Sequence, residues 1–180
     1  MHPSTLLPHL PVRGGDQEDA AKRVGTEMAM ADVDDFLASV LPPLTAADTA
    51  IHNGDAGPRI ALWSRKEPVT LFGALQIKTG WREIAPVFEW VASRFSNCES
   101  FEYEVLAAGV SGDLAYIAGI EHTTAAIGDA PTQAYELRVT TVFRREDDEW
   151  RVVHRHADPV PDSEPTHTQL GRLSEPQHDL

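Results

Sequence analysis

The side chains best suited to acid–base chemistry lie between residues 99 and 158, where polar and apolar residues alternate along the chain. A glutamate can act as a general base, and an arginine can neutralise negative charge that develops on an oxygen. We assign these roles to Glu121 and Arg138, which are the candidate catalytic residues. Glu102 is an alternative base, because two carboxylates close together in a dry pocket raise the pKa of one of them.

The turn residues predict that these side chains share one face of a sheet. They separate four strand-like segments, at about 99–110, 113–127, 132–146 and 149–157. If Gly128–Pro131 form a four-residue loop, Glu121 lies opposite Arg138, and Thr140 follows on the same face as a candidate ligand-binding residue. A two-residue turn at Ser111-Gly112 or at Gly112-Asp113 adds Glu102 or Glu104 to this face.

The last segment contains His154, His156 and Asp158, which alternate and therefore project from one side of a strand. Two imidazoles and a carboxylate in this pattern are compatible with a metal site or an acid–base cluster. We expect no metal and treat His154 and His156 as ligand-binding residues. Their face depends on whether the turn at Asp147–Glu149 has two or three residues, which the sequence leaves open. Trp63 is a candidate for a pocket wall or for the core.

Two interpretations of the charged face remain open at this point. In the first, the apolar face packs on the helices, and the carboxylates and Arg138 form a solvated surface. In the second, the charged face is concave and lines a cavity, while the other face is covered by a partner subunit.

Helical periodicity precedes the strands. Apolar residues recur at helical spacing from Val33 to Leu44, and Pro42-Pro43 is expected to break or kink this helix before it continues to His52. A further helix is expected at about 80–95, after an extended stretch at 69–72. Helices followed by a long antiparallel meander predict an α+β fold with one curved sheet.

Composition and charge restrict the class of protein. The chain has 180 residues and a net charge of −13, which disfavours nucleic acid and anionic membranes as partners. A single cysteine cannot form an internal disulfide, which is typical of a cytoplasmic protein. Prolines concentrate near both ends, so we expect flexible tails at residues 1–27 and 160–180 around one domain at 28–159.

Several motifs resemble the SnoaL-like branch of the nuclear transport factor 2-like superfamily, which also contains ketosteroid isomerase. They are His52-Asn-Gly-Asp55, Trp63-Ser64, Pro68-Val-Thr-Leu-Phe-Gly73, Gly80-Trp81, Gly112-Asp-Leu-Ala-Tyr116, Leu137-Arg-Val-Thr140 and Trp150-Arg-Val-Val-His-Arg-His156. The resemblance implies a cystatin-like α+β barrel, in which a cone-shaped sheet wraps around N-terminal helices and encloses a pocket. It also implies homodimers through the outer sheet face, and it favours Glu121, Arg138 and Thr140 as pocket lining.

The resemblance implies a small-molecule pocket but no particular reaction, because this fold carries many functions. Three functions remain: a cofactor-free acid–base enzyme of isomerase, cyclase or hydrolase type, a non-catalytic ligand-binding or oligomerisation module, and a structural dimer without a ligand. We expect no cofactor in any of them.

Overall fold

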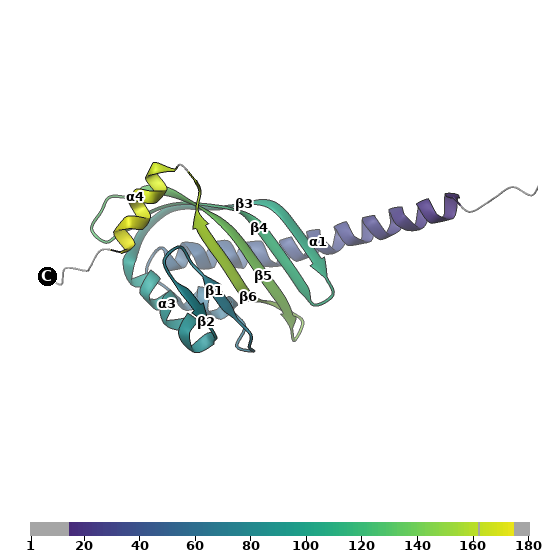
Figure 1. Cartoon of the computed structure of the whole chain (residues 1–180), viewed down its shortest axis with the longest axis horizontal. Helices are drawn as coiled ribbons and strands as arrows, with labels where there is room; N and C mark the ends of the chain where they lie inside the picture. The colour runs from purple at the N-terminus through teal and green to yellow at the C-terminus, as the bar shows by residue number, and fades with distance from the viewer. Residues whose placement is uncertain (1–14, 162, 175–180) are drawn as a thin grey trace, which may run out of the picture.

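The chain folds into helices packed against a six-stranded sheet (Figure 1). The computed structural model describes the backbone of residues 15–161 and 163–174, and the side chains within those ranges from residue 32 onwards. The helices are α1 (Gly15–Ile51), α2 (Gly57–Leu62), α3 (Trp81–Arg94) and α4 (Glu164–Leu173). The strands are β1 (Thr70–Phe72), β2 (Ile77–Thr79), β3 (Phe95–Ser111), β4 (Leu114–Ile127), β5 (Gln133–Glu146) and β6 (Glu149–Pro159).

The strands are arranged in the order β2-β1-β6-β5-β4-β3. All neighbours pair antiparallel except β1 and β6, which are parallel, with Thr70 opposite His154. The α+β class and the curved sheet are therefore confirmed. The sheet is mixed rather than purely antiparallel, because β1 enters it from the helical half of the chain, and it remains open at β2 and β3.

Helix α1 continues through Pro42 and Pro43, so the expected break is absent. Neither proline can donate to the carbonyl four residues earlier, which leaves the carbonyls of Ala38 and Ser39 without their helical partners. All four residues lie on the exposed side of the helix, where water can reach those carbonyls. The opposite side of α1 buries Phe36 and Val40 in the core.

Turn lengths and two β-bulges determine which side chains face the helices. Ser111 pairs with Leu114 across a two-residue turn, but the pairing shifts by one between Val105 and Ala107. A second shift follows the two-residue turn at Asp147-Asp148, where Val142 pairs with His154 and Phe143 with Val152. Because side chains alternate along a strand, each one-residue shift moves the following residues to the opposite face.

The C-terminal segment is partly folded, in contrast to the tail expected at residues 160–180. Helix α4 buries Leu170 and Leu173 in a second core cluster with residues of β4, β5 and β6. Its proline lies in the first helical turn, where a missing N–H costs little. At the other end of the chain, α1 already begins at Gly15; residues 1–14 of the expected tail lie outside the described residues.

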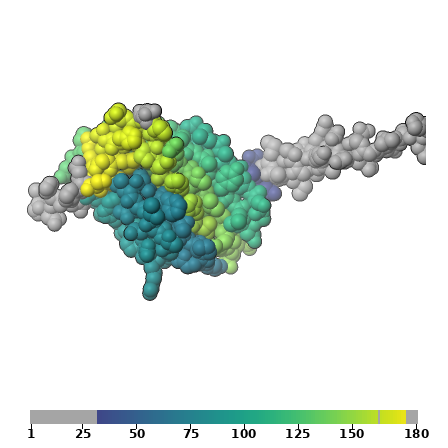
Figure 2. Space-filling model, viewed as in Figure 1, coloured from purple at the N-terminus to yellow at the C-terminus, as the bar shows by residue number. Residues whose placement is uncertain are grey.

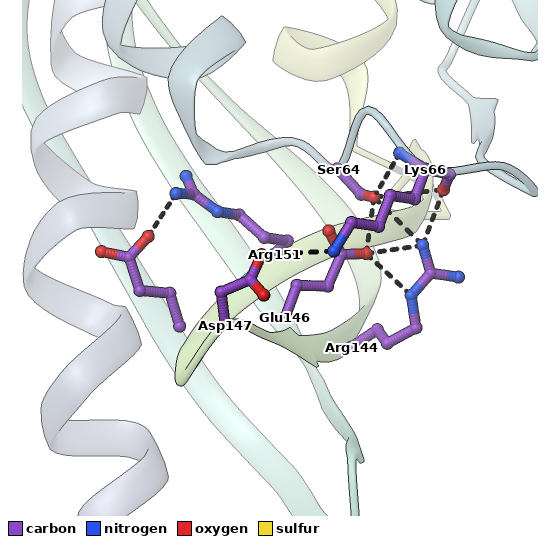
Figure 3. A network of polar contacts seen from close by, with 7 residues as sticks. Ser64, Lys66, Arg144, Glu146, Asp147 and Arg151 are labelled. Atoms are coloured by element: carbon purple, nitrogen blue, oxygen red, sulfur yellow. Dashed lines mark hydrogen bonds and ion pairs between the residues drawn. The ribbon is translucent and has the colours of Figure 1, made fainter.

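A polar network fixes the segment between α2 and β1 to the β5–β6 hairpin (Figure 3). Ser64 Oγ donates to Glu146 Oε1 at 2.7 Å, and Arg144 Nη2 donates to the carbonyl of Lys66 at 2.6 Å. Lys66 Nζ also contacts Asp147 Oδ2 at 3.2 Å. These contacts attach the start of β1 to the sheet at the end of the molecule opposite α4.

Candidate functional site

A cavity of about 110 Å³ lies between the inner face of the sheet and the helices. Its apolar walls come from β1, α3, β5 and α4, and include Leu71, Phe88 and Trp90. Its polar lining residues are Gln76 of the loop between β1 and β2 and, from α1, α2, β4, β5 and β6, Asp48, His52, Arg59, Glu121, Tyr135 and Arg155. Leu75, in the loop between β1 and β2, lines the cavity while 44% exposed, and therefore marks the side nearest to solvent.

Two buried ion pairs form the charged part of the cavity. Arg155 Nη2 donates to Glu121 Oε2 at 2.6 Å, and Arg59 Nη1 donates to Asp48 Oδ2 at 2.7 Å. The four side chains are at most 11% exposed, so water screens the pairs weakly. With two carboxylates and two guanidinium groups, the cluster is electrically balanced.

Glu121 lies in a low-dielectric environment, where burial and the neighbouring charges shift the pKa of its carboxyl in opposite directions. Burial raises the pKa of the Glu121 carboxyl, the positive charge of Arg155 opposes this shift, and Asp48 adds to it. The net direction is upward, so this carboxylate binds a proton more readily than an exposed one. That property is needed in a group that transfers protons near neutral pH.

His52 and Tyr135 form a second polar arrangement beside the ion pairs. His52 Nδ1 lies 2.6 Å from the carbonyl of Asp48, which can only accept, so Nδ1 carries the proton. Nε2 is then an acceptor, and the Tyr135 hydroxyl donates to it at 2.5 Å. Burial lowers the pKa of His52 to about 4, so its ring is neutral at pH 7.

Three buried polar atoms on the inner face have no hydrogen-bond partner among the described residues: Tyr103 Oη, Thr123 Oγ1 and Arg155 Nε. Buried polar atoms are nearly always paired in folded proteins. Tyr103 pairs directly with Glu121 across β3 and β4, and Arg155 itself lines the cavity. Of the three, Arg155 Nε belongs to a residue that lines the cavity and is therefore available to a bound molecule or to water.

The predicted pairing of Glu121 with Arg138 is wrong. Glu121 faces Leu137, and Arg138 faces Ile120, because the observed register of β4 and β5, with Ala125 opposite Gln133, differs by one residue from that of the assumed four-residue loop. Arg138 therefore lies on the outer face, where it binds Asp158 with both side chains 40% or more exposed. Of the two candidate catalytic residues, Glu121 alone lines the cavity.

The other polar candidates also lie on the outer face. Thr140 pairs with His156 there, and His154 accepts or donates a hydrogen bond with Thr70 at 2.7 Å. The shift at Val153 produces this arrangement, since it turns Arg155 inward and both histidines outward. Glu102 is exposed opposite His122, because the bulge at Leu106 turns Tyr103 inward in place of the glutamates.

Trp63 is a core residue that does not line the cavity. It is 2% exposed and packs on Phe88 with ring centroids 5.3 Å apart. Phe88 in turn contributes to the cavity wall, so Trp63 supports that wall from behind.

The sequence interpretation missed Asp48, His52, Arg59, Tyr135 and Arg155. One signal was available for the first two, which lie four residues apart on the buried side of α1, between apolar residues. Polar side chains in such a position need buried partners. Arg155 gave no comparable signal, because the sheet face on which its side chain lies depends on the shift in β5–β6 pairing at Val153.

Neither a metal cluster nor a membrane helix is found in the described part of the chain. No group of three or more His, Cys, Asp or Glu side chains among residues 32–161 and 163–174 could hold a metal ion. No helix within the described residues is long and apolar enough to cross a bilayer.

Comparisons with known proteins agree with this architecture. The family model described as a SnoaL-like domain matches residues 43–162. No curated protein matches the sequence. Among solved structures, an NTF2-like protein of unknown function from Pseudomonas putida KT2440 aligns with a TM-score of 0.59 at 21% identity, over 77% of this chain and 93% of its own.

Two further structures show the same fold. An NTF2-like family protein from Streptomyces avermitilis, named as a candidate dehydratase, aligns with a TM-score of 0.56 at 23% identity, over 71% of this chain and 97% of its own. A candidate calcium/calmodulin-dependent protein kinase II association domain from Xanthomonas campestris aligns with a TM-score of 0.54 at 16% identity, over 71% and 87%. At these identities the likeness concerns the fold and not the activity.

Proposed function

Because this chain belongs to the SnoaL-like domain family, we propose that it binds a small, electrically neutral molecule with a carbonyl or hydroxyl group and an apolar part. The observation that carries this proposal is the cavity itself, in which two balanced ion pairs face apolar walls. Ligand sites typically combine apolar walls with a few convergent polar groups.

The charge balance of the cavity favours a neutral ligand. Asp48 and Glu121 are already matched by Arg59 and Arg155. An ionised ligand would bring an unmatched charge into a buried site, which costs free energy unless a partner compensates it. A neutral carbonyl oxygen needs only a donor, and Arg155 Nε has no other partner among the described residues.

The size of the cavity supports a small ligand. Its volume of about 110 Å³ lies below the roughly 300–1,000 Å³ of most drug-sized sites. A molecule of a few carbons with one polar group matches this space better than a steroid or a multi-ring aromatic compound.

A second candidate function is acid–base catalysis on the same ligand, favoured by the raised pKa of Glu121. Glu121 would take a proton from the carbon next to a carbonyl, and the electrons of the C–H bond would move to the carbonyl oxygen. Arg155 would stabilise the enolate by donating a hydrogen bond. In a ligand with a C=C bond β,γ to the carbonyl, return of the proton to the γ-carbon of the dienolate would complete an isomerisation without a cofactor.

The binding proposal can be tested by NMR titration of the ¹⁵N-labelled chain with compounds of equal length: 2-pentanone, pentanoate and pentylamine. We expect 2-pentanone to shift the resonances of cavity residues such as Trp90 and to bind most tightly of the three. Arg155→Met should weaken this binding, whereas the matched outer-face variant Arg138→Ala should leave it unchanged. Tighter binding of pentanoate, or shifts confined to the outer face, would contradict the proposal.

We further propose a homodimer through the outer sheet face. Support comes from three apolar side chains exposed on β3 and β4, namely Leu106, Leu114 and Tyr116, at 65%, 53% and 43%. Exposed apolar groups of this size are costly in water when they lie together. A monomer mass in light scattering at micromolar concentration would contradict the dimer.

A cytoplasmic location is also proposed, and it rests on the single cysteine of the chain. Fractionation of cells that express the tagged chain tests it. Recovery of the chain in a membrane or secreted fraction would contradict it.

A further inference from the structure

Helix α4 is a part of the cavity that the family model does not include. The matched region ends at residue 162, and α4 spans Glu164–Leu173. Leu170 and Leu173 nevertheless line the cavity, together with Trp90 of α3 and the loop between β1 and β2. In the space-filling view, the yellow surface of the C-terminal residues lies against the teal surface of the segment that contains this loop (Figure 2).

Polar contacts hold α4 in one position on the sheet. Gln169 Nε2 donates to the carbonyl of Ala125 at 2.8 Å, and the backbone N–H of Glu136 donates to Thr166 Oγ1 at 2.9 Å. Both α4 side chains are fully buried, so their loss would leave unpaired polar groups in the interior. Arg172 also donates to Gln133 Oε1 at 2.9 Å.

These contacts define where the two leucines lie relative to the ion pairs. Thr166 and Gln169 bind backbone groups of β4 and β5, the strands that also carry Glu121 and Tyr135. Leu170 and Leu173 are 7% and 8% exposed and pack in the cluster that contains Leu137. Because α4 is anchored to the same strands as the polar groups, its leucines form a wall at a set distance from them.

We propose that α4 is the end wall of the ligand cavity, and that Leu170 and Leu173 determine the greatest ligand length that the cavity accepts. This inference rests on the proposed binding of a neutral carbonyl compound. It adds the specificity-determining residues and places them in a segment outside the matched domain. Removing a leucine side chain extends the cavity away from the ion pairs, and a larger side chain shortens it.

The test uses a series of methyl ketones, from 2-butanone to 2-decanone, titrated into the full chain and followed by NMR. For the wild type, affinity should rise with each added carbon and then fall once the chain meets α4. For Leu170→Ala and Leu173→Ala, the longest ketone that binds should gain two or more carbons, with about 10-fold tighter binding of that ketone than in the wild type. Leu173→Phe should shift the limit in the opposite direction.

A matched control is Ile117→Ala, which removes the same number of carbons from a fully buried residue of β4 that does not line the cavity. Its length limit should equal that of the wild type. If the wild type, Leu173→Ala and Leu173→Phe all bind ketones with the same length limit, the inference about α4 is wrong and the proposed function still stands. Absence of ketone binding in the wild type would instead overturn the proposed function. If Leu170→Ala does not fold, the two Leu173 variants decide the outcome.

Discussion

Arg155 Nη2 lies 2.6 Å from Glu121 Oε2, and these two side chains come from strands on either side of β5. The pair joins β4 to β6 across the inner face of the sheet. Its members are nearly buried, so each charge depends on the other for stabilisation. The ion pair is thus both a structural link and the main polar feature of the cavity.

Removing one member of this pair should be costly. Arg155→Met leaves the Glu121 carboxylate buried without its partner, and the free energy of unfolding should fall by about 3–5 kcal/mol. Chemical denaturation at pH 7 measures this change. The double variant Glu121→Gln with Arg155→Met should be more stable than Arg155→Met alone, because no uncompensated charge remains. A double variant no more stable than Arg155→Met would contradict this explanation.

The ion pair on the outer face should contribute much less to stability than the buried pair of Arg155 and Glu121. Arg138 and Asp158 are 51% and 40% exposed, so their attraction is screened by water. Arg138→Ala should change the free energy of unfolding by about 0–1 kcal/mol. A loss as large as that of Arg155→Met would show that the outer face carries a structural role that its exposure does not indicate.

His52 should make stability depend on pH in a defined range. Its pKa is lowered by burial to about 4 in the folded state, against about 6.5 in the unfolded state. Between these values the unfolded state binds more protons, so stability rises from pH 4 to pH 6.5 and is then independent of this group. His52→Asn should remove this contribution, which amounts to about 3 kcal/mol over the range. Denaturation curves at several pH values, compared between the two proteins, measure it.

His122 provides a control, because its effect on the pH dependence of stability should have the opposite sign to that of His52. Partial burial disfavours its charged form, but hydrogen bonds to Glu104 and Glu136 raise its pKa overall. Its contribution is therefore present below the unfolded pKa and is lost as the pH rises through the folded pKa. His122→Asn should thus reduce stability at low pH and not at high pH. The same sign for both histidines would contradict the assignment of His52.

Two glycines should respond in opposite ways to alanine. A Cβ at Gly119 would lie 2.0 Å from the carbonyl oxygen of Glu104, which is backbone and cannot move aside easily. Gly119→Ala should cost about 1–3 kcal/mol. A Cβ at Gly171 of α4 would meet no atom within 4 Å, and Gly171→Ala should stabilise the protein by about 0.5–1 kcal/mol. Thermal unfolding of both variants tests the pair, and stabilisation by Gly119→Ala would contradict the close approach of β3 and β4.

If the second candidate function holds, Glu121→Gln should abolish proton transfer without removing binding. The wild type should accelerate exchange of the α-protons of 2-pentanone with D₂O, as measured by ¹H NMR. Loss of the general base should reduce this rate by about 10²–10⁴-fold. Tyr103→Phe, which keeps the ring beside Glu121, should reduce it less. Equal rates in the wild type and in Glu121→Gln would exclude Glu121 as the base and leave the binding function.

The sequence predicted the bounds of the helices and strands better than the sheet face on which each side chain lies. The four long strands, the helix at 80–95 and the end of α1 near His52 follow the expected boundaries closely. Helix α4 was missed, because Thr166 and Gln169 are polar residues whose burial depends on backbone partners distant in sequence. Its proline-rich surroundings are also typical of flexible segments.

The candidate site could be predicted only in part, for a related reason. Glu121 does lie in the cavity, but Arg138, Thr140, Glu102 and both strand histidines are on the outer face. Alternation along one strand is visible in a sequence, whereas a bulge at Leu106 or Val153 results from contacts between strands. One extra residue in a strand is enough to place every side chain that follows it on the face opposite to the predicted one.

The shift at Val153 also has a consequence for how proteins of this architecture diversify. Deletion of Val153 would make the β5–β6 pairing regular and would still leave Arg155 opposite Thr141, on the inner face. A register in which Val153 is kept and pairs with Val142 would instead turn Arg155 outward and bring His154 and His156 to the inner face. The inner face of β6 would then carry imidazole groups in place of a guanidinium group without any substitution. Comparisons of aligned residues alone would not reveal such a change, because the sequence is the same in both registers.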